Sequence, residues 1–400
     1  MPASFLFYDL ETYGSDPRTT RIAQFAAIRT DADLNQIDTP ISVFVKPADD
    51  LLPSPIATVI TGIAPQDALR DGVSEAEIFA LIFEEMARPE TCSAGYNSLR
   101  FDDEFVRYGL FRNFYDPYER EWRSGNSRWD LLDVIAMTPA LHVSQRYPAA
   151  RLCAAPVIPL ARHPRIDNRV LVFDLAQDPA ALLRLAPDEI ADRLYTPTAD
   201  LPQGEERIAL KEVHLNRCPA LIAWNHLRPA DFERLQIDPA QVERHAAQIR
   251  EAGPELVEKV RRVYANDRAR DPSDVDASLY DAFIGDGDKR LLRNVRTTAP
   301  EALAQAAFEF RDARLPELLF RYRARNWPQT LSAGERERWD AYRRHRLVDD
   351  SGLSEFNFER FAIELQQARA MVGEDGAKQA LLDRLHDWAG TIARDLNASG

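Results

Sequence analysis

The sequence predicts a multidomain protein of the α/β class, with an N-terminal α/β region, a small β-rich region and a C-terminal all-α region. Three observations lead to this prediction. The 400 residues exceed what one compact core usually absorbs. Short apolar strand patterns alternate with helical patterns over about the first 135 residues, and short segments rich in Val and Ile and interrupted by Pro follow. Beyond about Asp271, apolar residues recur at helical spacing to the end of the chain.

Individual elements follow from the same patterns. In the first region we expect strands over 5–10 and 22–31, a helix over 74–87, and a strand, turn and helix over 91–111. The β-rich region has strand patterns at 156–164, 168–176 and 207–216. Helical patterns in the last region cover 299–312, 334–347, 358–372 and 377–396.

Composition narrows the function classes. The formal net charge of −14 argues against a protein that coats nucleic acid indiscriminately, although it leaves room for a nucleic-acid enzyme with a local basic groove. No apolar stretch is long enough to span a membrane and no leader pattern follows Met1, so we expect a cytoplasmic protein. Three widely spaced cysteines suggest neither a disulfide framework nor a zinc site.

Two carboxylates end the first predicted strand. Asp9 and Glu11 share a strand face with Phe5 and Phe7, because side chains alternate between the faces of a sheet. Two acids in this position repel each other unless a cation lies between them, and their oxygens suit Mg²⁺ or Mn²⁺. The alternative is that Glu11 simply begins a solvated turn, which is the commoner reason for such a pair.

Two further features favour the metal hypothesis. Asp102 and Asp103 follow an apolar segment and can open a helix as its N-cap. Residues 58–66 supply a Gly-containing turn, predicted between a strand and a helix, of the kind that lets a backbone approach phosphate or sugar.

Residues 112–130 carry the clearest nucleic-acid pattern. Asp116 is predicted to cap a helix that places Tyr118 and Trp122 side by side, with arginines adjacent. Aromatic faces beside cations hold single-stranded bases without reading sequence. Arg107, in the helix opened by Asp102, is placed to reach the phosphate path. An ordinary core helix with two aromatic residues is the alternative.

The motifs together resemble the exodeoxyribonuclease I family of processive 3′→5′ single-strand DNA exonucleases of the DEDDh type. The resemblance rests on "FLFYDLETYGSDP", "RIAQFAAIRTD", "KPADD", "TGIAPQ", "GYNSLRFDDE", "RNFYDPY" and "NSRWDLLDV", and it continues through "YTPTADL", "VHLNRCP", "DPSDVDASLYDAFI" and "LLFRYRARNWPQTL". It implies an incomplete RNase H-like exonuclease domain over 1–136, an SH3-like β-rich domain over 137–270 and a helical domain over 271–400.

The resemblance also implies site residues and partners. Asp9, Glu11 and Asp102 match the family's first three carboxylates, which bind two Mg²⁺ ions and carry catalysis, and Thr12 matches the position that binds the 3′ sugar. The family implies a monomer that binds single-stranded DNA in repair and recombination and docks to the acidic tail of single-stranded DNA-binding protein. Further strand contacts implied in the β-rich domain are Asn168, Tyr195 and Asn216.

One family motif is missing. Members carry a final His-x4-Asp whose His is the general base and whose Asp completes the metal site, but here the pattern jumps at about Ala136 into the SH3-like domain. His226 with Asp231 and His345 with Asp350 have this spacing, and we interpret both as coincidence. The missing helices are expected to leave an apolar face of the sheet exposed. Two hypotheses stay open: an exonuclease with impaired turnover, and a catalytically silent single-strand DNA or repair-partner binding protein.

Overall fold

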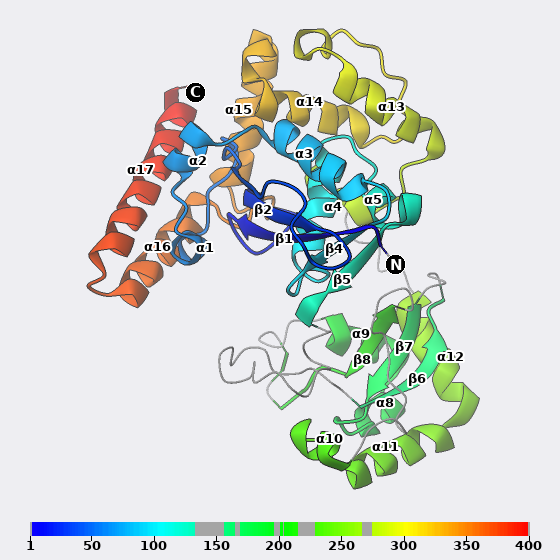
Figure 1. Cartoon of the computed structure of the whole chain (residues 1–400). Coiled ribbons are helices and arrows are strands. Elements are labelled where there is room, and N and C mark those ends of the chain that lie inside the picture. Colours follow the sequence, from blue (N-terminus) through cyan, green and yellow to red (C-terminus); the bar gives the residue numbers. More distant parts are fainter. Residues whose placement is uncertain are drawn as a thin grey trace. The chain divides into compact units, whose positions relative to one another are not determined.

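The structure is a computed structural model in which the chain forms two compact units (Figure 1). The first unit combines Met1–Asp130 with Asp271–Gly400, and the second is Leu131–Arg270. The N-terminal α/β region and the C-terminal helices therefore fold together. The described residues are 2–132, 156–164, 169–195, 201–202, 204–214, 229–265 and 274–398.

A five-stranded mixed sheet lies at the centre of the first unit (Figure 1). The strand order is β3-β2-β1-β4-β5, with β1 antiparallel to β2 and parallel to β4. Strand β3 runs antiparallel to β2, and β5 runs parallel to β4. The strands are β1 (Ser4–Thr12), β2 (Ile22–Thr30), β3 (Ile41–Phe44), β4 (Thr91–Gly95) and β5 (Ser127–Asp130).

The two faces of this sheet differ. Leu6, Tyr8 and Leu10 of β1 pack with helices α3 (Glu75–Ala87) and α4 (Asp102–Arg112) in one hydrophobic core. The opposite side of β1 carries Phe5, Phe7, Asp9 and Glu11, and neither ring belongs to a hydrophobic core of the described residues.

Neighbouring strands extend this second side. Ile28 pairs directly with Phe7, and the Trp129 ring stacks beside Phe5 with 6.1 Å between ring centroids. Ile28 and Trp129 remain 44% and 40% exposed. We call the side formed by Phe5, Phe7, Asp9, Glu11, Ile28 and Trp129 the open face. The exposure of Ile28 and Trp129 agrees with the expectation that an apolar face of the sheet is exposed.

The segment 58–66 differs from its prediction. Pro55–Thr61 forms helix α1, and Gly62 ends it with φ of 73°, a conformation that favours glycine. A second helix, α2 (Pro65–Asp71), follows directly. The glycine therefore joins two helices rather than a strand and a helix, because Ser54 caps the first helix and Pro55 begins it.

The C-terminal part of the first unit is helical, as predicted, except at 299–312. There only a short 3₁₀ turn, η5 (Pro300–Ala302), forms, and Phe308 and Phe310 pack against a hydrophobic cluster of neighbouring helices. Packing of the two rings outweighs the helical propensity of the alanines. The remaining elements are η4 (Val275–Tyr280), α13 (Asp286–Thr297), α14 (Leu315–Asn326), η6 (Pro328–Thr330), α15 (Ala333–Leu347), α16 (Phe358–Val372) and α17 (Gly376–Ala398).

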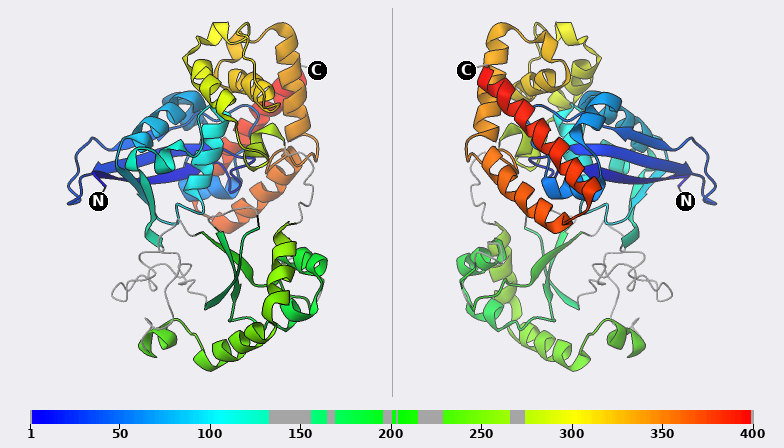
Figure 2. Two further views of the ribbon diagram at one scale, coloured as in Figure 1. Left: turned by 90° about the vertical axis from the view of Figure 1, so that its right-hand side faces the viewer. Right: turned by 90° about the vertical axis from the view of Figure 1, so that its left-hand side faces the viewer.

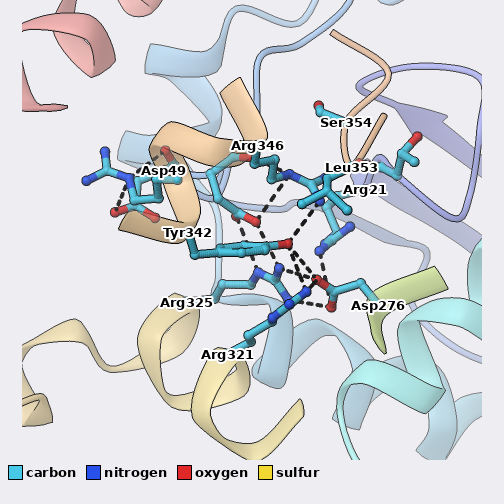
Figure 3. Close-up of polar contacts among 12 residues, drawn as sticks. Arg21, Asp49, Asp276, Arg321, Arg325, Tyr342, Arg346, Leu353 and Ser354 are labelled. Carbon is cyan, nitrogen blue, oxygen red and sulfur yellow. Dashed lines mark hydrogen bonds and ion pairs between the residues drawn. The ribbon is translucent and has the colours of Figure 1, made fainter. Parts of the chain in front are cut away.

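Apolar packing and buried ion pairs join the two ends of the chain. Helices α16 and α17 lie together, as Figure 2 shows, and share a core with α1. Figure 3 shows the ionic cluster around Arg325 and Asp276. Arg325 Nη2 lies 2.6 Å from Asp276 Oδ2 and 2.8 Å from Asp50 Oδ2. Although burial raises the pKa of Asp50, Arg325 and Arg346 hold it well below the usual range. Asp50 therefore stays ionised and fixes α14 and α15 to the sheet region.

The second unit has its own core beneath a three-stranded antiparallel sheet of order β6-β7-β8. In the described part of this unit, five helices accompany the strands and pack on them partly through α9 and α12. In the described part of the chain, no helix is long and apolar enough to cross a membrane. The elements are β6 (Val157–Arg162), β7 (Arg169–Asp174), β8 (Leu210–His214), α8 (Ala180–Arg184), α9 (Pro187–Tyr195), α10 (Pro229–Arg234), α11 (Pro239–Glu251) and α12 (Gly253–Ala265).

Candidate active site

The candidate site lies where the end of β1 meets the start of α4. Asp9 and Glu11 project from the open face near the end of β1. Asp102 begins α4, with Phe101 rather than an aspartate in the capping position. Its Oδ1 accepts a hydrogen bond of 3.2 Å from the backbone N–H of Leu10. Leu10 lies between Asp9 and Glu11 in sequence, so this hydrogen bond holds the third predicted carboxylate against the strand that carries the other two.

The charge of Asp9 raises the pKa of the other two carboxyl groups. Burial, followed by the charge of Asp9, raises the pKa of Asp102 to about 7, and Asp102 is only 4% exposed. The same two causes raise the pKa of Glu11. Within the described chain, no arginine, lysine or histidine forms an ion pair with any of the three. Carboxylates gathered without a cationic partner are the arrangement that a bound cation relieves.

Asp103 supports Asp102 from the other side of the helix start. Its carboxylate accepts hydrogen bonds from Tyr8 Oη at 2.8 Å, Arg120 Nη2 at 2.6 Å and Arg128 Nη1 at 2.7 Å. Although burial alone raises the pKa of Asp103, Arg120 and Arg128 hold it well below the usual range. Two adjacent aspartates therefore have opposite environments, one ion-paired and one without a cation.

Asp130 holds the loop between β4 and α4 by hydrogen bonds to its backbone. Its two carboxylate oxygens accept hydrogen bonds from the backbone N–H groups of Asn97, at 2.9 Å, and Leu99, at 3.2 Å. Gly95, at the end of β4, allows the loop to pass close by, because an added Cβ would lie 2.9 Å from the Tyr8 carbonyl oxygen. Sequence reasoning missed Asp130 and the partners of Asp103. The available signal was an Asp at the end of a strand that is followed by an apolar run.

The turn after β1 is held from the C-terminal part of the chain. Thr12 Oγ1 donates a hydrogen bond of 2.7 Å to the Gly14 carbonyl oxygen, so the predicted sugar-binding hydroxyl fastens the turn in this structure. Glu355 accepts from Ser15 N at 2.9 Å and Ser15 Oγ at 2.7 Å. A Cβ at Gly14 would lie 2.3 Å from Glu355 Oε2, so the turn fits closely beneath this side chain.

The predicted DNA-binding helix is shorter than expected. Helix α5 (Glu119–Trp122) begins after Tyr118, while Asp116 accepts a hydrogen bond from Tyr118 N, so the expected capping arrangement is wrong. A following 3₁₀ turn, η1 (Arg123–Gly125), leads to β5. Trp122 is 68% exposed, whereas the Tyr118 ring lies 6.3 Å from the Phe283 ring.

Arg107 lies nearer to acids than the sequence suggests. Its Nε is 2.6 Å from Glu121 Oε1, its Nη1 is 2.7 Å from Glu104 Oε1, and its guanidinium lies 5.5 Å from the centre of the Tyr118 ring. The side chain is buried, and its charge is already balanced by two carboxylates.

The remaining predicted site residues do not belong to the candidate site described above. Asn168, Asn216 and His226 lie outside the described residues, and so does the side chain of Tyr195. His345 is exposed and lies 3.0 Å from Asp349, whereas Asp350 pairs with Arg360. The spacing from His345 to Asp350 thus does not form a helical His-x4-Asp motif here, because α15 ends at Leu347.

The residue types at the site fit a divalent cation, since all three are hard oxygen donors without a cationic neighbour. In the part of the chain that the structure describes, no group of three or more His, Cys, Asp or Glu side chains stands close enough together to hold a metal ion. Asp9 acts electrostatically on both of the others. The three donors therefore lie in one region of the protein, but their side chains do not form a metal-binding group in this structure.

Comparison with protein-family models identifies three regions. Residues 6–154 match the model of an exonuclease, 123–266 the Exonuclease I SH3-like domain, and 273–392 the Exonuclease I C-terminal domain. Among solved structures, exonuclease I from Methylocaldum szegediense is 38% identical, with a TM-score of 0.84 over 98% of this chain and 99% of that one. A metal-free complex of E. coli exonuclease I with single-stranded DNA is 36% identical, with a TM-score of 0.84 over 98% of this chain and 100% of that one.

Curated relatives point to the same family as the family models and the solved structures. Exodeoxyribonuclease I of Escherichia coli K12 is 36% identical over 474 residues, covering 98% of this chain and 98% of that protein. The Haemophilus influenzae protein of the same name is 33% identical, covering 96% and 98%. Because this chain has 400 residues, at least 74 positions of the 474-residue alignment have no counterpart in it. The chain belongs to the exodeoxyribonuclease I family of nucleases.

Proposed function

We propose that the chain is a Mg²⁺-dependent exonuclease that shortens single-stranded DNA from its 3′ end and releases 5′-mononucleotides, with low turnover. The observation that carries the proposal is the placement of Asp102 against β1 beside Asp9 and Glu11, without a cationic partner among the described residues. Solved relatives include exonuclease I bound to single-stranded DNA and a zinc-bound form of that complex.

Each residue has a distinct role in this proposal. Asp9, Glu11 and Asp102 would hold the cation, which stabilises the charge that develops on a phosphodiester during hydrolysis. Asp103, with Tyr8, Arg120 and Arg128, keeps the first turn of α4 in place so that Asp102 stays against the strand. Glu355 holds the turn beyond Thr12, where the terminal sugar would lie.

Low turnover follows from what the site lacks. The family pattern breaks off before its His-x4-Asp, we interpret the two later matches to this spacing as coincidence, and no described histidine pairs with the three acids. A positioned general base contributes typically about 10²–10⁴-fold to such a reaction. The absence of the fourth carboxylate also weakens the binding of a second cation. We therefore expect a rate reduced by at least about 10²-fold relative to members that carry the motif.

The path of the DNA strand is part of the proposal. We propose that Tyr118 and Trp122 contact bases, with Asn168, Tyr195 and Asn216 as further candidates for strand contacts. Because Arg107 is already paired with two acids, its role is to orient the Tyr118 ring rather than to bind phosphate directly. By family resemblance we also propose a monomer in the cytoplasm that acts in DNA repair and recombination and docks to single-stranded DNA-binding protein.

A labelled 3′ end tests the proposal. Purified protein is incubated with Mg²⁺ and a single-stranded oligonucleotide carrying a 3′ label, over hours because turnover is low. We expect slow release of labelled mononucleotide that Asp9→Ala abolishes and Asp16→Asn, at a partly exposed acid of the same segment, leaves unchanged. Release that survives Asp9→Ala would point to a contaminating nuclease and overturn the proposal.

A second candidate function is a catalytically silent protein that binds single-stranded DNA or a repair partner. It is favoured by the lack of a closed ligand set among the described residues and by the 74 or more unmatched positions. Binding of the oligonucleotide at nanomolar to micromolar concentration without any shortening in Mg²⁺ or Mn²⁺ would support it over the first candidate.

A further inference from the structure

The open face carries a row of aromatic rings that begins beside the candidate active site. The Phe5 and Phe7 rings have centroids 6.0 Å apart, those of Phe5 and Trp129 are 6.1 Å apart, and both pairs are inclined by only 24°. Phe7 is two residues from Asp9 on the same side of β1. The row therefore leads from the carboxylates across the sheet to β5.

The rings stand above small side chains. Strand β4 lies between β1 and β5 and places Cys92 opposite Phe5 and Ser127, with Ala94 opposite Phe7 and Trp129. Cys92 and Ala94 are buried. Because these side chains are short, the larger rings form the surface of the sheet here.

We propose that this aromatic row, Phe7, Phe5 and Trp129, binds bases of single-stranded DNA by stacking. The proposal rests on the proposed function in one respect, namely that the strand whose bases stack is the one whose 3′ end lies at Asp9 and Glu11. Stacking on side-chain rings tolerates every base, since each base presents a π-face. Aromatic residues on an open sheet face serve the same purpose in single-strand RNA-binding domains.

The acids at one end of the row favour this occupant over a second copy of the chain. A protein surface that covered the open face would take Asp9 and Glu11 out of water, although no described cation pairs with them. A DNA strand brings its phosphates to that end together with divalent cations and leaves its bases for the rings. The apolar and acidic parts of the face then each meet a matching part of one ligand.

Binding to a fluorescein-labelled oligothymidylate, measured by anisotropy with Ca²⁺ in place of Mg²⁺ and over minutes so that no cleavage occurs, tests the proposal. Phe5→Leu and Trp129→Leu are each expected to weaken binding about 5- to 150-fold, the loss of one stacked base. Trp129→Phe, which keeps a ring, should restore most of the affinity. Ile60→Ala, at an exposed apolar residue of α1, should leave it within about twofold. Quenching of Trp129 fluorescence by the oligonucleotide should disappear in Trp129→Leu.

The outcomes separate this inference from the proposed function. If Phe5→Leu and Trp129→Leu bind as the unmodified chain does while Asp9-dependent shortening persists, the inference is overturned and the exonuclease function stands. If both variants lose binding but Mg²⁺ supports no shortening, the inference stands and the exonuclease function falls. Absence of oligonucleotide binding by the unmodified chain, or a concentration-dependent dimer that Phe5→Leu dissociates, would overturn the inference.

Discussion

The buried carboxylate of Asp103 allows a quantitative test of how the candidate site is supported. Asp103→Asn keeps the size of the side chain but removes the charge that balances Arg120, whose side chain is fully buried, and Arg128. Two charge-assisted hydrogen bonds are worth about 1.5–3 kcal/mol each. Their loss, about 3–6 kcal/mol, agrees with the roughly 3–5 kcal/mol usually lost when one partner of a buried ion pair is removed. We expect a loss of about 3–5 kcal/mol in the free energy of unfolding.

The effect should depend on pH in a definite direction. Burial raises the pKa of Asp103, but Arg120 and Arg128 together hold it well below its usual range. A carboxyl group with a depressed pKa in the folded state stabilises the protein above its unfolded pKa, near 4, and this contribution is lost as the pH falls through the folded pKa. The difference between the unmodified chain and Asp103→Asn should therefore be complete at pH 7 and shrink below about pH 4.

Urea unfolding followed by tryptophan fluorescence is a suitable assay, because five of the six tryptophans belong to the first unit. Asp16→Asn is the matched control, since Asp16 pairs with the exposed Arg18 and should cost about 1 kcal/mol or less. Replacing both buried partners, as Asp103→Leu with Arg120→Met, should recover part of the loss. A loss below about 1 kcal/mol for Asp103→Asn, or a difference that persists unchanged at pH 3, would refute the reasoning.

Three further changes have defined expectations. Asp102→Asn should raise the free energy of unfolding by up to about 4 kcal/mol at pH 8 in a chelator. Burial and the charge of Asp9 raise the pKa of Asp102 to about 7, so ionisation of this carboxyl group costs stability as the pH rises from about 4 through 7. Identical urea unfolding curves would contradict this expectation. For the same reason, Mg²⁺ affinity of the unmodified chain measured by calorimetry should rise with pH through about 7, and a flat profile would count against it. Gly109→Ala should destabilise the first unit by about 1–3 kcal/mol or more, because the added Cβ would lie 1.7 Å from Phe79 Cζ; an unchanged melting temperature would be inconsistent with that packing.

The sequence predicted the position of the carboxylates because the reason for it is local. Alternation along β1 puts Asp9 and Glu11 on one side, and an apolar segment followed by two aspartates predicts the start of α4 within one residue. The nearly parallel placement of β1 and β4 then brings Asp102 to the strand end.

The surroundings of the site could not be predicted in this way. Arg120 is one of the arginines that the sequence places beside Tyr118 and Trp122, yet it is buried against Asp103. Helix α5 begins two residues later than its capping pattern indicates, so the side chains of this segment point in other directions than expected. Which arginine meets which acid depends on tertiary packing, because both partners lie in segments with the same local pattern as an exposed, charged surface.

Contacts between the two ends of the chain depend even more on tertiary structure. Phe308 and Phe310 leave a helical pattern to pack against neighbouring helices. Asp50 meets Arg325, which lies 275 residues further along, and nothing in the sequence near either residue indicates the pairing. Sequence patterns predicted β1, β2, α3 and α4 of the first unit, whereas the ion pairs between its two halves depend on the tertiary fold.

The 275 residues between Asp50 and Arg325 affect how the protein folds while it is being made on the ribosome. Ribosomes add roughly 5–20 residues per second, so Asp50 waits on the order of 15–60 s for Arg325 and Arg346 to be made. During that interval the nascent N-terminal half lacks the arginines that pair with Asp50, and the apolar residues of α1 lack their partners on α16 and α17. The nascent chain is therefore expected to need chaperone protection, and truncations that remove the last helices should accumulate as insoluble protein rather than as a free nuclease domain.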